Sequence, residues 1–239
     1  MTRTTRRHAL LAALALAATA AHAQTYATRP ITIMVGYSAG GAVDIVARAV
    51  GQQLQTSLGQ PVVIENKPGA GTNIATRALI EAAPDGQTLM LAANALAANV
   101  SLFQPAPYQL DRVTPIAQIG RVPVVIAASP QSKVDSVQTL VAQSKAKPGS
   151  VDFGTPGNGS TPHLAVELFA HAAGIRLTHV PYKGGAQAIT DAIAGHIQIV
   201  AVNALEVLPQ AKAGKLRVIA VLSDKRSTIF PDAPTIAES

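Results

Sequence analysis

The 239-residue sequence has no cysteine and no tryptophan, and aromatic residues make up only 3% of it. The absence of cysteine excludes disulfide bonds, thiol catalysis and cysteine-ligated zinc. The formal net charge is +6, but Arg3, Arg6 and Arg7 stand in an N-terminal leader that has no acidic residue, and removing these three charges leaves +3. Lys and Arg are otherwise scattered singly, without interleaved aromatic residues. The sequence therefore predicts no nucleic-acid partner.

Motifs for nucleotides and metals are also missing. The glycine-rich stretch 154–159 does not fit G-x-G-x-x-G, and no G-x-x-x-x-G-K-[ST] occurs in the sequence. His, Asp and Glu do not cluster at the spacings typical of metal sites. We therefore expect neither a cofactor nor a metal ion.

The first 23 residues are predicted to be a signal peptide. A basic start precedes an apolar run from Ala9 to Ala20, and Ala21-His22-Ala23 places small residues where a signal peptidase cleaves. The run of about 12 residues is shorter than the ~20 that a membrane-spanning helix needs. We expect a soluble mature protein in the periplasm, beginning at Gln24. The pair Arg6-Arg7 also permits the twin-arginine route, so the route of export stays open.

After the leader, short β-rich apolar runs alternate with stretches of helical periodicity. We expect strands at 31–35, 61–65, 88–92, 151–154, 177–180, 197–203 and 216–222, and helices at 43–58, 73–82, 95–102, 136–145, 162–173, 187–194 and 206–213. Such βα units predict an α/β fold with mostly parallel sheets and helices on their faces. Between Tyr108 and Pro130 two extended runs, 115–119 and 122–128, follow each other without a helix. We interpret this region as a crossing between two lobes.

Two glycine-rich loops precede helices, one in each half of the chain. Gly40-Gly41 joins the first strand to the first long helix, where free backbone N–H groups favour an anion. A sharp turn without a ligand explains the two glycines equally well. Asp44 lies in the first helical turn, and the helix dipole makes it a stabiliser of the helix start rather than a ligand contact.

The second loop is Thr155-Pro156-Gly157-Asn158-Gly159-Ser160-Thr161-Pro162-His163. Ser160 and Thr161 are good helix caps, and Pro162 suits the first turn of a helix. His163 is predicted to have a packing or capping role, because no metal or triad pattern accompanies it. Two such loops in opposite halves predict a ligand held between lobes.

One motif favours an enzyme instead. Gly36-Tyr37-Ser38-Ala39-Gly40 fits the G-x-S-x-G nucleophile elbow, and it lies between a strand and a helix as that motif requires. Ser38 stands on the first strand, however, whereas the elbow normally follows several strands. No downstream Asp and His stand in the order and spacing of a triad. A serine hydrolase is therefore the alternative, and we expect that the protein is not an enzyme.

Seven ordered motifs between Arg29 and the last residue together resemble the Bug (TctC-like) family, the extracytoplasmic receptors of tripartite tricarboxylate transporters. They are Arg29-Pro30-Ile31, Gly40-Gly41 with Asp44 and Arg48, Val63-Ile64-Glu65-Asn66-Lys67-Pro68-Gly69-Ala70-Gly71, Pro84-Asp85-Gly86-Gln87-Thr88-Leu89, Gly157-Asn158-Gly159-Ser160-Thr161-Pro162-His163-Leu164, His179-Val180-Pro181-Tyr182-Lys183-Gly184 and Pro234-Thr235-Ile236-Ala237-Glu238-Ser239.

This resemblance implies a two-lobed Venus-flytrap fold of the type II periplasmic binding proteins. The first lobe would comprise residues 24–119 and 223–239, and the second lobe residues 120–222. Such receptors bind amino acids, di- or tricarboxylates or aromatic acids, largely through backbone groups of the two loops, and deliver them to membrane transporter subunits. We expect a monomer.

The resemblance also implies the ligand-binding residues. By position they are Tyr37, Ser38, Ala39, Gly40, Gly41, Thr155, Gly157, Gly159, Ser160 and Thr161, with Asn94, Tyr182 and Asn203 on the far side of the pocket. Tyr182 and Asn203 fit core or hinge positions equally well. Gly36 replaces the proline usual in the family, which should loosen the first loop. The family also continues beyond Ser239, so that we expect an incomplete first lobe and keep a non-functional truncated receptor as a further alternative.

Overall fold

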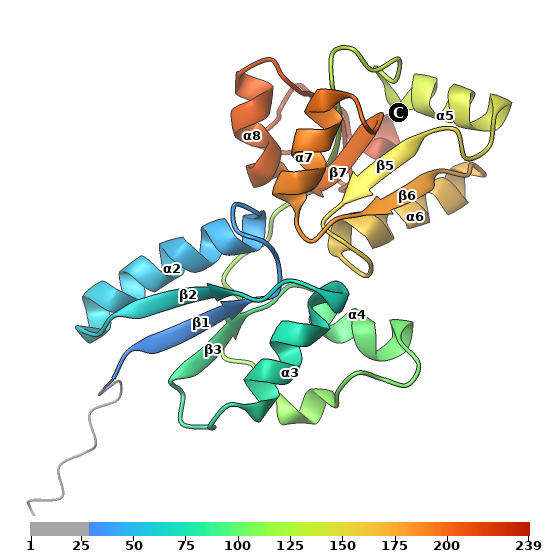
Figure 1. Ribbon diagram of the computed structural model, residues 1–239. Helices are drawn as coiled ribbons and strands as arrows, with labels where there is room; N and C mark the ends of the chain where they lie inside the picture. Colours follow the sequence, from blue (N-terminus) through green and yellow to red (C-terminus); the bar gives the residue numbers. More distant parts are fainter. Residues whose placement is uncertain (1–28) are drawn as a thin grey trace, which may run out of the picture.

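The first lobe is built on a three-stranded parallel sheet (Figure 1). The computed structural model describes residues 29–239, so the predicted signal peptide lies outside the described residues. The strands, in the spatial order β2-β1-β3, are β1 (Ile31–Val35), β2 (Val62–Asn66) and β3 (Thr88–Leu91). The helical segments are α2 (Ala42–Leu58), η1 (Ala70–Thr72), α3 (Asn73–Glu81), α4 (Ala95–Leu102) and η2 (Leu110–Arg112).

The second lobe contains a five-stranded sheet in the order β6-β5-β7-β4-β8. Its strands are β4 (Val124–Ala128), β5 (Asp152–Thr155), β6 (Thr178–Pro181), β7 (Ile199–Asn203) and β8 (Arg217–Val221). Its helices are α5 (Val137–Ala146), α6 (Thr161–Ala173), α7 (Gly185–Ala194), α8 (Ala204–Lys212) and the 3-10 turn η3 (Ile236–Glu238). No helix among residues 29–239 is long and apolar enough to cross a membrane.

The prediction of mostly parallel sheets is right for the first lobe and for β5, β6 and β7, but β4 is antiparallel to both of its neighbours. β4 follows the connection between the lobes rather than a crossover helix. The helix-strand alternation that predicts parallel pairing is therefore missing at this strand.

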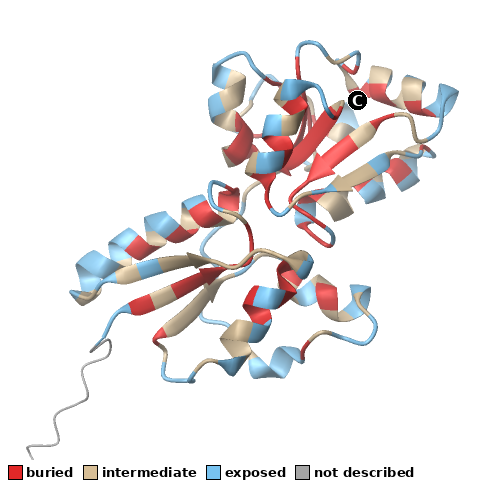
Figure 2. Ribbon diagram, viewed as in Figure 1, coloured by how far each residue is buried: buried red, intermediate tan, exposed pale blue. Residues whose placement is uncertain are grey.

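The core of the second lobe lies on both faces of its sheet. Alternate residues of β4 point to opposite sides, as in any strand. Val125 and Ala127 join the cluster under α7 and α8, whereas Ile126 and Ala128 join the cluster under α5 and α6. Figure 2 shows the strands at the centre of this sheet as buried, while β2 and β3 of the first lobe are mainly intermediate. The second lobe thus has the more fully enclosed sheet.

The two lobes are connected by residues 113–123, which have no regular secondary structure. The sequence predicted an extended run without a helix at 115–119; these residues contain no helix, and they pair with no strand of the described chain. Ile116 is 79% exposed, so this stretch has no apolar contact that would fix it in a sheet.

The assignment of residues 223–239 to the first lobe is also wrong. Ala233 belongs to the core cluster under α7 and α8, and Ile229 and Phe230 pack against the same cluster. The N–H of Val221, the last residue of β8, donates to the carbonyl of Pro234 at 2.8 Å. Apolar contacts and this backbone pairing therefore hold the segment on the second lobe.

Candidate ligand-binding site

The first glycine loop connects β1 to α2, and some of its polar groups already have partners. The N–H of Gly40 donates to Asp44 Oδ2 at 2.9 Å, and the N–H of Ser38 donates to the carbonyl of Lys183 at 2.9 Å. Gly40 has φ 82°, which favours glycine. Tyr37 is 8% exposed and belongs to the first-lobe core. The N–H groups of Ala39 and Gly41 in this loop make no hydrogen bond within the described chain.

Asp44 has the structural role that its position in the first helical turn favours. Its buried carboxylate accepts hydrogen bonds from Gly40 N–H, from the Arg48 guanidinium and from Asn66 Nδ2. Burial alone raises the pKa of Asp44, but these hydrogen bonds outweigh burial and hold the pKa below its usual value. Asp44 thus fixes the loop and has no free face for a ligand.

The second loop connects β5 to α6 and is organised by its own side chains. Thr155 Oγ1 accepts from the N–H of Gly157 at 3.2 Å, and Ser160 caps α6 by accepting from the N–H of His163, as predicted. Gly157 and Gly159 have φ 132° and 74°, values that favour glycine. The N–H of Gly159 donates to His163 Nδ1 at 3.2 Å.

The imidazole of His163 also stacks on His179 with ring centroids 4.0 Å apart. These contacts give His163 the packing and capping role that the sequence predicted. Burial, reinforced by His163, lowers the pKa of His179 to about 4, so His179 is neutral at neutral pH. Among the described residues no cluster of three or more metal-ligating side chains occurs.

Both loops contact the opposite lobe. Ser38 in the first lobe bonds to Lys183 in the second, and the Thr161 hydroxyl in the second lobe donates to Asn94 Oδ1 in the first. A methyl group placed on Gly159 would lie 2.7 Å from Asn99 Oδ1, which shows how closely that loop approaches α4. The structure thus brings both loops to the boundary between the lobes, although no hydrogen bond joins one loop directly to the other in the described chain.

Four buried polar atoms at this boundary have no hydrogen-bond partner among the described residues. They are Ser38 Oγ, Thr72 Oγ1, Asn99 Oδ1 and Glu206 Oε2. Buried polar atoms in proteins are nearly always paired, so unpaired ones mark places where water or a ligand binds. Ser38 Oγ in particular makes no bond to any His or Asp within residues 29–239, and the hydrolase alternative gains no support from its surroundings.

The other predicted residues have different surroundings. Asn94 precedes α4 and contacts Thr161. Tyr182 packs on the second-lobe core, and its hydroxyl donates to Asp191 Oδ2 at 2.6 Å. Burial and the Asp191 carboxylate raise the pKa of Tyr182, so the hydroxyl stays a donor that Asp191 occupies. Asn203 precedes α8 and donates to Glu206. For Tyr182 these contacts favour a core position over a position in the ligand pocket.

Sequence reasoning missed Glu206, the buried acid of the first turn of α8. The spacing Asn203-x-x-Glu206 is that of a helix capping box and could have identified the side chain as a cap. Nothing in the local sequence shows that the same carboxylate also reaches Gly41 of the other lobe, where a methyl group would lie 3.5 Å from Oε2.

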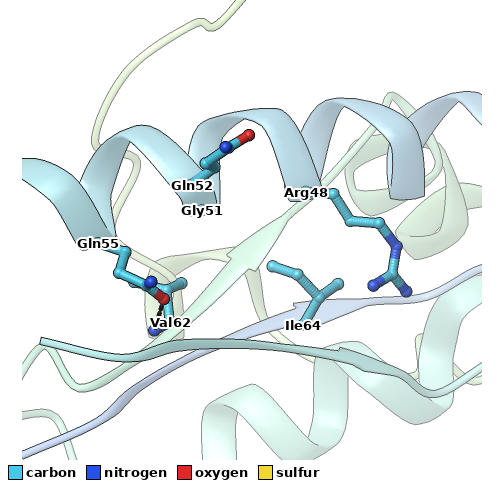
Figure 3. Close-up of a pocket in the computed structure, with 6 residues that line it drawn as sticks. All are labelled: Arg48, Gly51, Gln52, Gln55, Val62 and Ile64. Atoms are coloured by element: carbon cyan, nitrogen blue, oxygen red, sulfur yellow. Dashed lines mark hydrogen bonds between the residues drawn. The ribbon is translucent and has the colours of Figure 1, made fainter.

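The depression shown in Figure 3 is separate from these groups. It has a volume of about 250 Å³ and lies between α2 and β2, on the first lobe alone. Its lining residues are Arg48, Gly51, Gln52, Gln55, Val62 and Ile64. None of the predicted ligand-binding residues and none of the four unpaired buried atoms belongs to it, so it is not the candidate site.

Known proteins resemble this chain in both sequence and fold. Residues 46–239 match a family described as the tripartite tricarboxylate transporter family receptor. The chain is 42% identical to Protein BugT from Bordetella pertussis over 219 residues, which cover 90% of this chain and 67% of BugT. It is also 39% identical over 228 residues to a protein of Bordetella bronchiseptica, covering 95% of this chain and 68% of that protein.

Solved structures of similar proteins have the same two-lobed α/β fold. MatC from Rhodopseudomonas palustris with bound malate has a TM-score of 0.83 at 28% identity, covering 89% of this chain and 73% of MatC. A second R. palustris protein, Rpa4515 with adipate, has a TM-score of 0.85 at 32% identity, covering 89% of this chain and 72% of that one. The predicted fold class and family resemblance are confirmed. The chain belongs to the family of tripartite tricarboxylate transporter receptors.

Proposed function

We propose that the protein is an extracytoplasmic solute-binding receptor that closes its two lobes around a small carboxylate. The observation that carries this proposal is that each of the two glycine-rich helix starts contacts the opposite lobe. The contacts are the hydrogen bonds from Ser38 N–H to Lys183 O and from the Thr161 hydroxyl to Asn94 Oδ1. Helix starts favour anions because their N–H groups are unpaired and the helix dipole is positive there. A ligand that contacts both lobes stabilises the closed form by its higher affinity for that form.

The relatives support a carboxylate as the ligand class. MatC is described with malate and Rpa4515 with adipate, and both are at least 28% identical to this chain over most of its length. The predicted ligand contacts at Tyr37, Ala39 and Gly41 and at Thr155 to Thr161 remain part of this proposal. The unpaired buried atoms Ser38 Oγ and Asn99 Oδ1 extend the set, because a bound ligand or its waters would pair them.

The cellular setting is part of the same proposal. The family consists of periplasmic receptors, and residues 1–23 are proposed to direct export before cleavage at Gln24. The closed form would present a surface made by both lobes to membrane transporter subunits. We propose that the receptor itself acts as a monomer.

Isothermal titration calorimetry of the purified exported protein with malate, adipate, succinate, butyrate and hexanoate tests the function. We expect saturable binding of at least one acid. We also expect Thr161→Val to weaken that binding about 3- to 10-fold, because it removes the interlobe bond to Asn94.

Thr56→Val is the matched control, since the Thr56 hydroxyl bonds to the carbonyl of Gln52 within α2 on the first lobe. It should bind like the wild type. Absence of binding across a wide panel of acids would contradict the proposed function.

A further inference from the structure

The two oxygens of the Glu206 carboxylate have different surroundings. Its Oε1 accepts hydrogen bonds from the N–H of Asn203 at 3.3 Å and from Asn203 Nδ2 at 3.1 Å, both within the second lobe. The residue is 7% exposed, and its Oε2 makes no hydrogen bond of normal geometry within the described chain. One carboxylate oxygen therefore has partners, while the other is buried and unpaired.

The unpaired oxygen lies against backbone on both sides. A methyl group on Gly185 of the second lobe would lie 1.8 Å from Oε2, so only glycine leaves room for the carboxylate there. A methyl group on Gly41 of the first lobe would lie 3.5 Å from the same oxygen. Glu206 is thus held between the start of α2 in one lobe and the start of α7 in the other.

Three helix N-termini meet at this carboxylate. α2 begins after Gly41, α7 begins after Gly184, and α8 begins after Asn203. The two glycine caps offer no side chain to the unpaired N–H groups of their helices. An anion is favoured at such a place by the helix dipoles. Burial raises the pKa of Glu206, and the hydrogen bonds from Asn203, together with the nearby N–H dipole of Ala42, oppose that rise.

We propose that Glu206 takes the place of one ligand carboxylate at the start of α2, and that the receptor therefore selects acids with a single carboxylate over diacids. This inference rests on the proposed function. In either protonation state the side chain fills the space beside Gly41, and in the ionised state it repels a second carboxylate across a short buried distance. The ligand carboxylate is left to the start of α6, where the N–H of Asn158 makes no hydrogen bond in the described chain.

Two pairs of acids that differ in one carboxylate test the proposal: butyrate against succinate, and hexanoate against adipate. Calorimetry of the wild-type protein should show the monoacid of the preferred length binding at least about 10-fold more tightly than its diacid. Glu206→Ala should raise the affinity for the diacid about 10-fold or more and change the affinity for the monoacid less than about 3-fold. Glu81→Ala, which removes an exposed acid from α3, should bind like the wild type.

Glu206→Gln tests the effect of charge separately, because it keeps the size of the side chain and removes the charge. It should fold like the wild type by circular dichroism and bind the diacid more tightly than the wild type does, by about 3-fold or more. A wild-type preference for diacids, or equal changes for both acids in the Glu206 variants, would overturn the inference and leave the proposed function standing. Failure of every acid to bind would overturn both.

Discussion

Gly184→Ala is expected to hold the two lobes apart. Gly184 has φ 171°, an extended backbone that alanine adopts without strain, so the substitution acts only through its methyl group. That methyl group would lie 2.0 Å from Ser38 Oγ and 3.1 Å from Ser38 N across the lobe boundary. Rotation of the Ser38 side chain relieves the first contact and leaves the second. The lobes must therefore separate slightly at this point.

The separation has a calculable effect. The Ser38 N–H to Lys183 O bond of 2.9 Å is lost when the loop moves away by about 1 Å, at a cost of about 0.5–1.5 kcal/mol. Overpacking adds to this, for a total of about 1–3 kcal/mol. Because ~1.4 kcal/mol corresponds to tenfold in affinity, ligand binding should weaken about 5- to 150-fold. The cores of both lobes are untouched, so the melting temperature without ligand should stay nearly unchanged.

Calorimetry and small-angle X-ray scattering with and without ligand measure this effect. Gly120→Ala is the matched control, since a methyl group there meets no atom within 4 Å. Adding Ser38→Gly to Gly184→Ala removes the obstructing side chain and should restore part of the affinity. If Gly184→Ala binds ligand within twofold of the wild type and closes equally, the reasoning about this contact is refuted.

Three further predictions concern stability. Burial lowers the pKa of His179 from 6.5 to about 4, so the folded form resists protonation of this side chain. The free energy of unfolding in urea should therefore be highest above pH 6.5 and fall by about 1–3 kcal/mol between pH 6.5 and 4. His179→Asn should reduce this fall. Asp44→Ala leaves Gly40 and Asn66 without their acceptor and should cost about 1–3 kcal/mol in the same assay, whereas a cost near zero would contradict the role assigned to it. Phe153→Ala empties a fully buried site in the second lobe and should cost about 3–5 kcal/mol by thermal unfolding, and a cost below 1 kcal/mol would show that this core is not packed as described.

The regular elements were largely predictable from the sequence because their signals are local. The apolar run at Ile31–Val35 and the helical stretch at Ala95–Leu102 have the predicted bounds. α2 ends at Leu58, and the following Gly59 has φ 64°, as a left-handed C-cap glycine should. Ser160 caps α6 by accepting a hydrogen bond from the N–H of His163 in the first turn of the helix. Each of these features depends on residues within a few positions of one another.

The composition of the site was predicted less completely. The two glycine loops were identified because a strand, a glycine-rich turn and a helix start are adjacent in sequence. The sequence predicted free N–H groups at these loops but did not show which of them are already paired: Gly40 donates to Asp44, and Ser38 donates to Lys183. The second of these bonds joins residues that are distant in the chain, and no local pattern specifies it.

Three features were decided only by the tertiary structure. The antiparallel direction of β4, the packing of Ala233 on the second lobe and the position of Glu206 beside Gly41 all depend on which distant segments meet. The sequence by itself determined where most strands and helices lie and which turns offer backbone donors, because periodicity, caps and glycines act over short distances. Long-range packing decides the direction of a strand, the lobe on which a terminal segment packs and the side chain that lies against a helix start. Only the folded chain specifies these features.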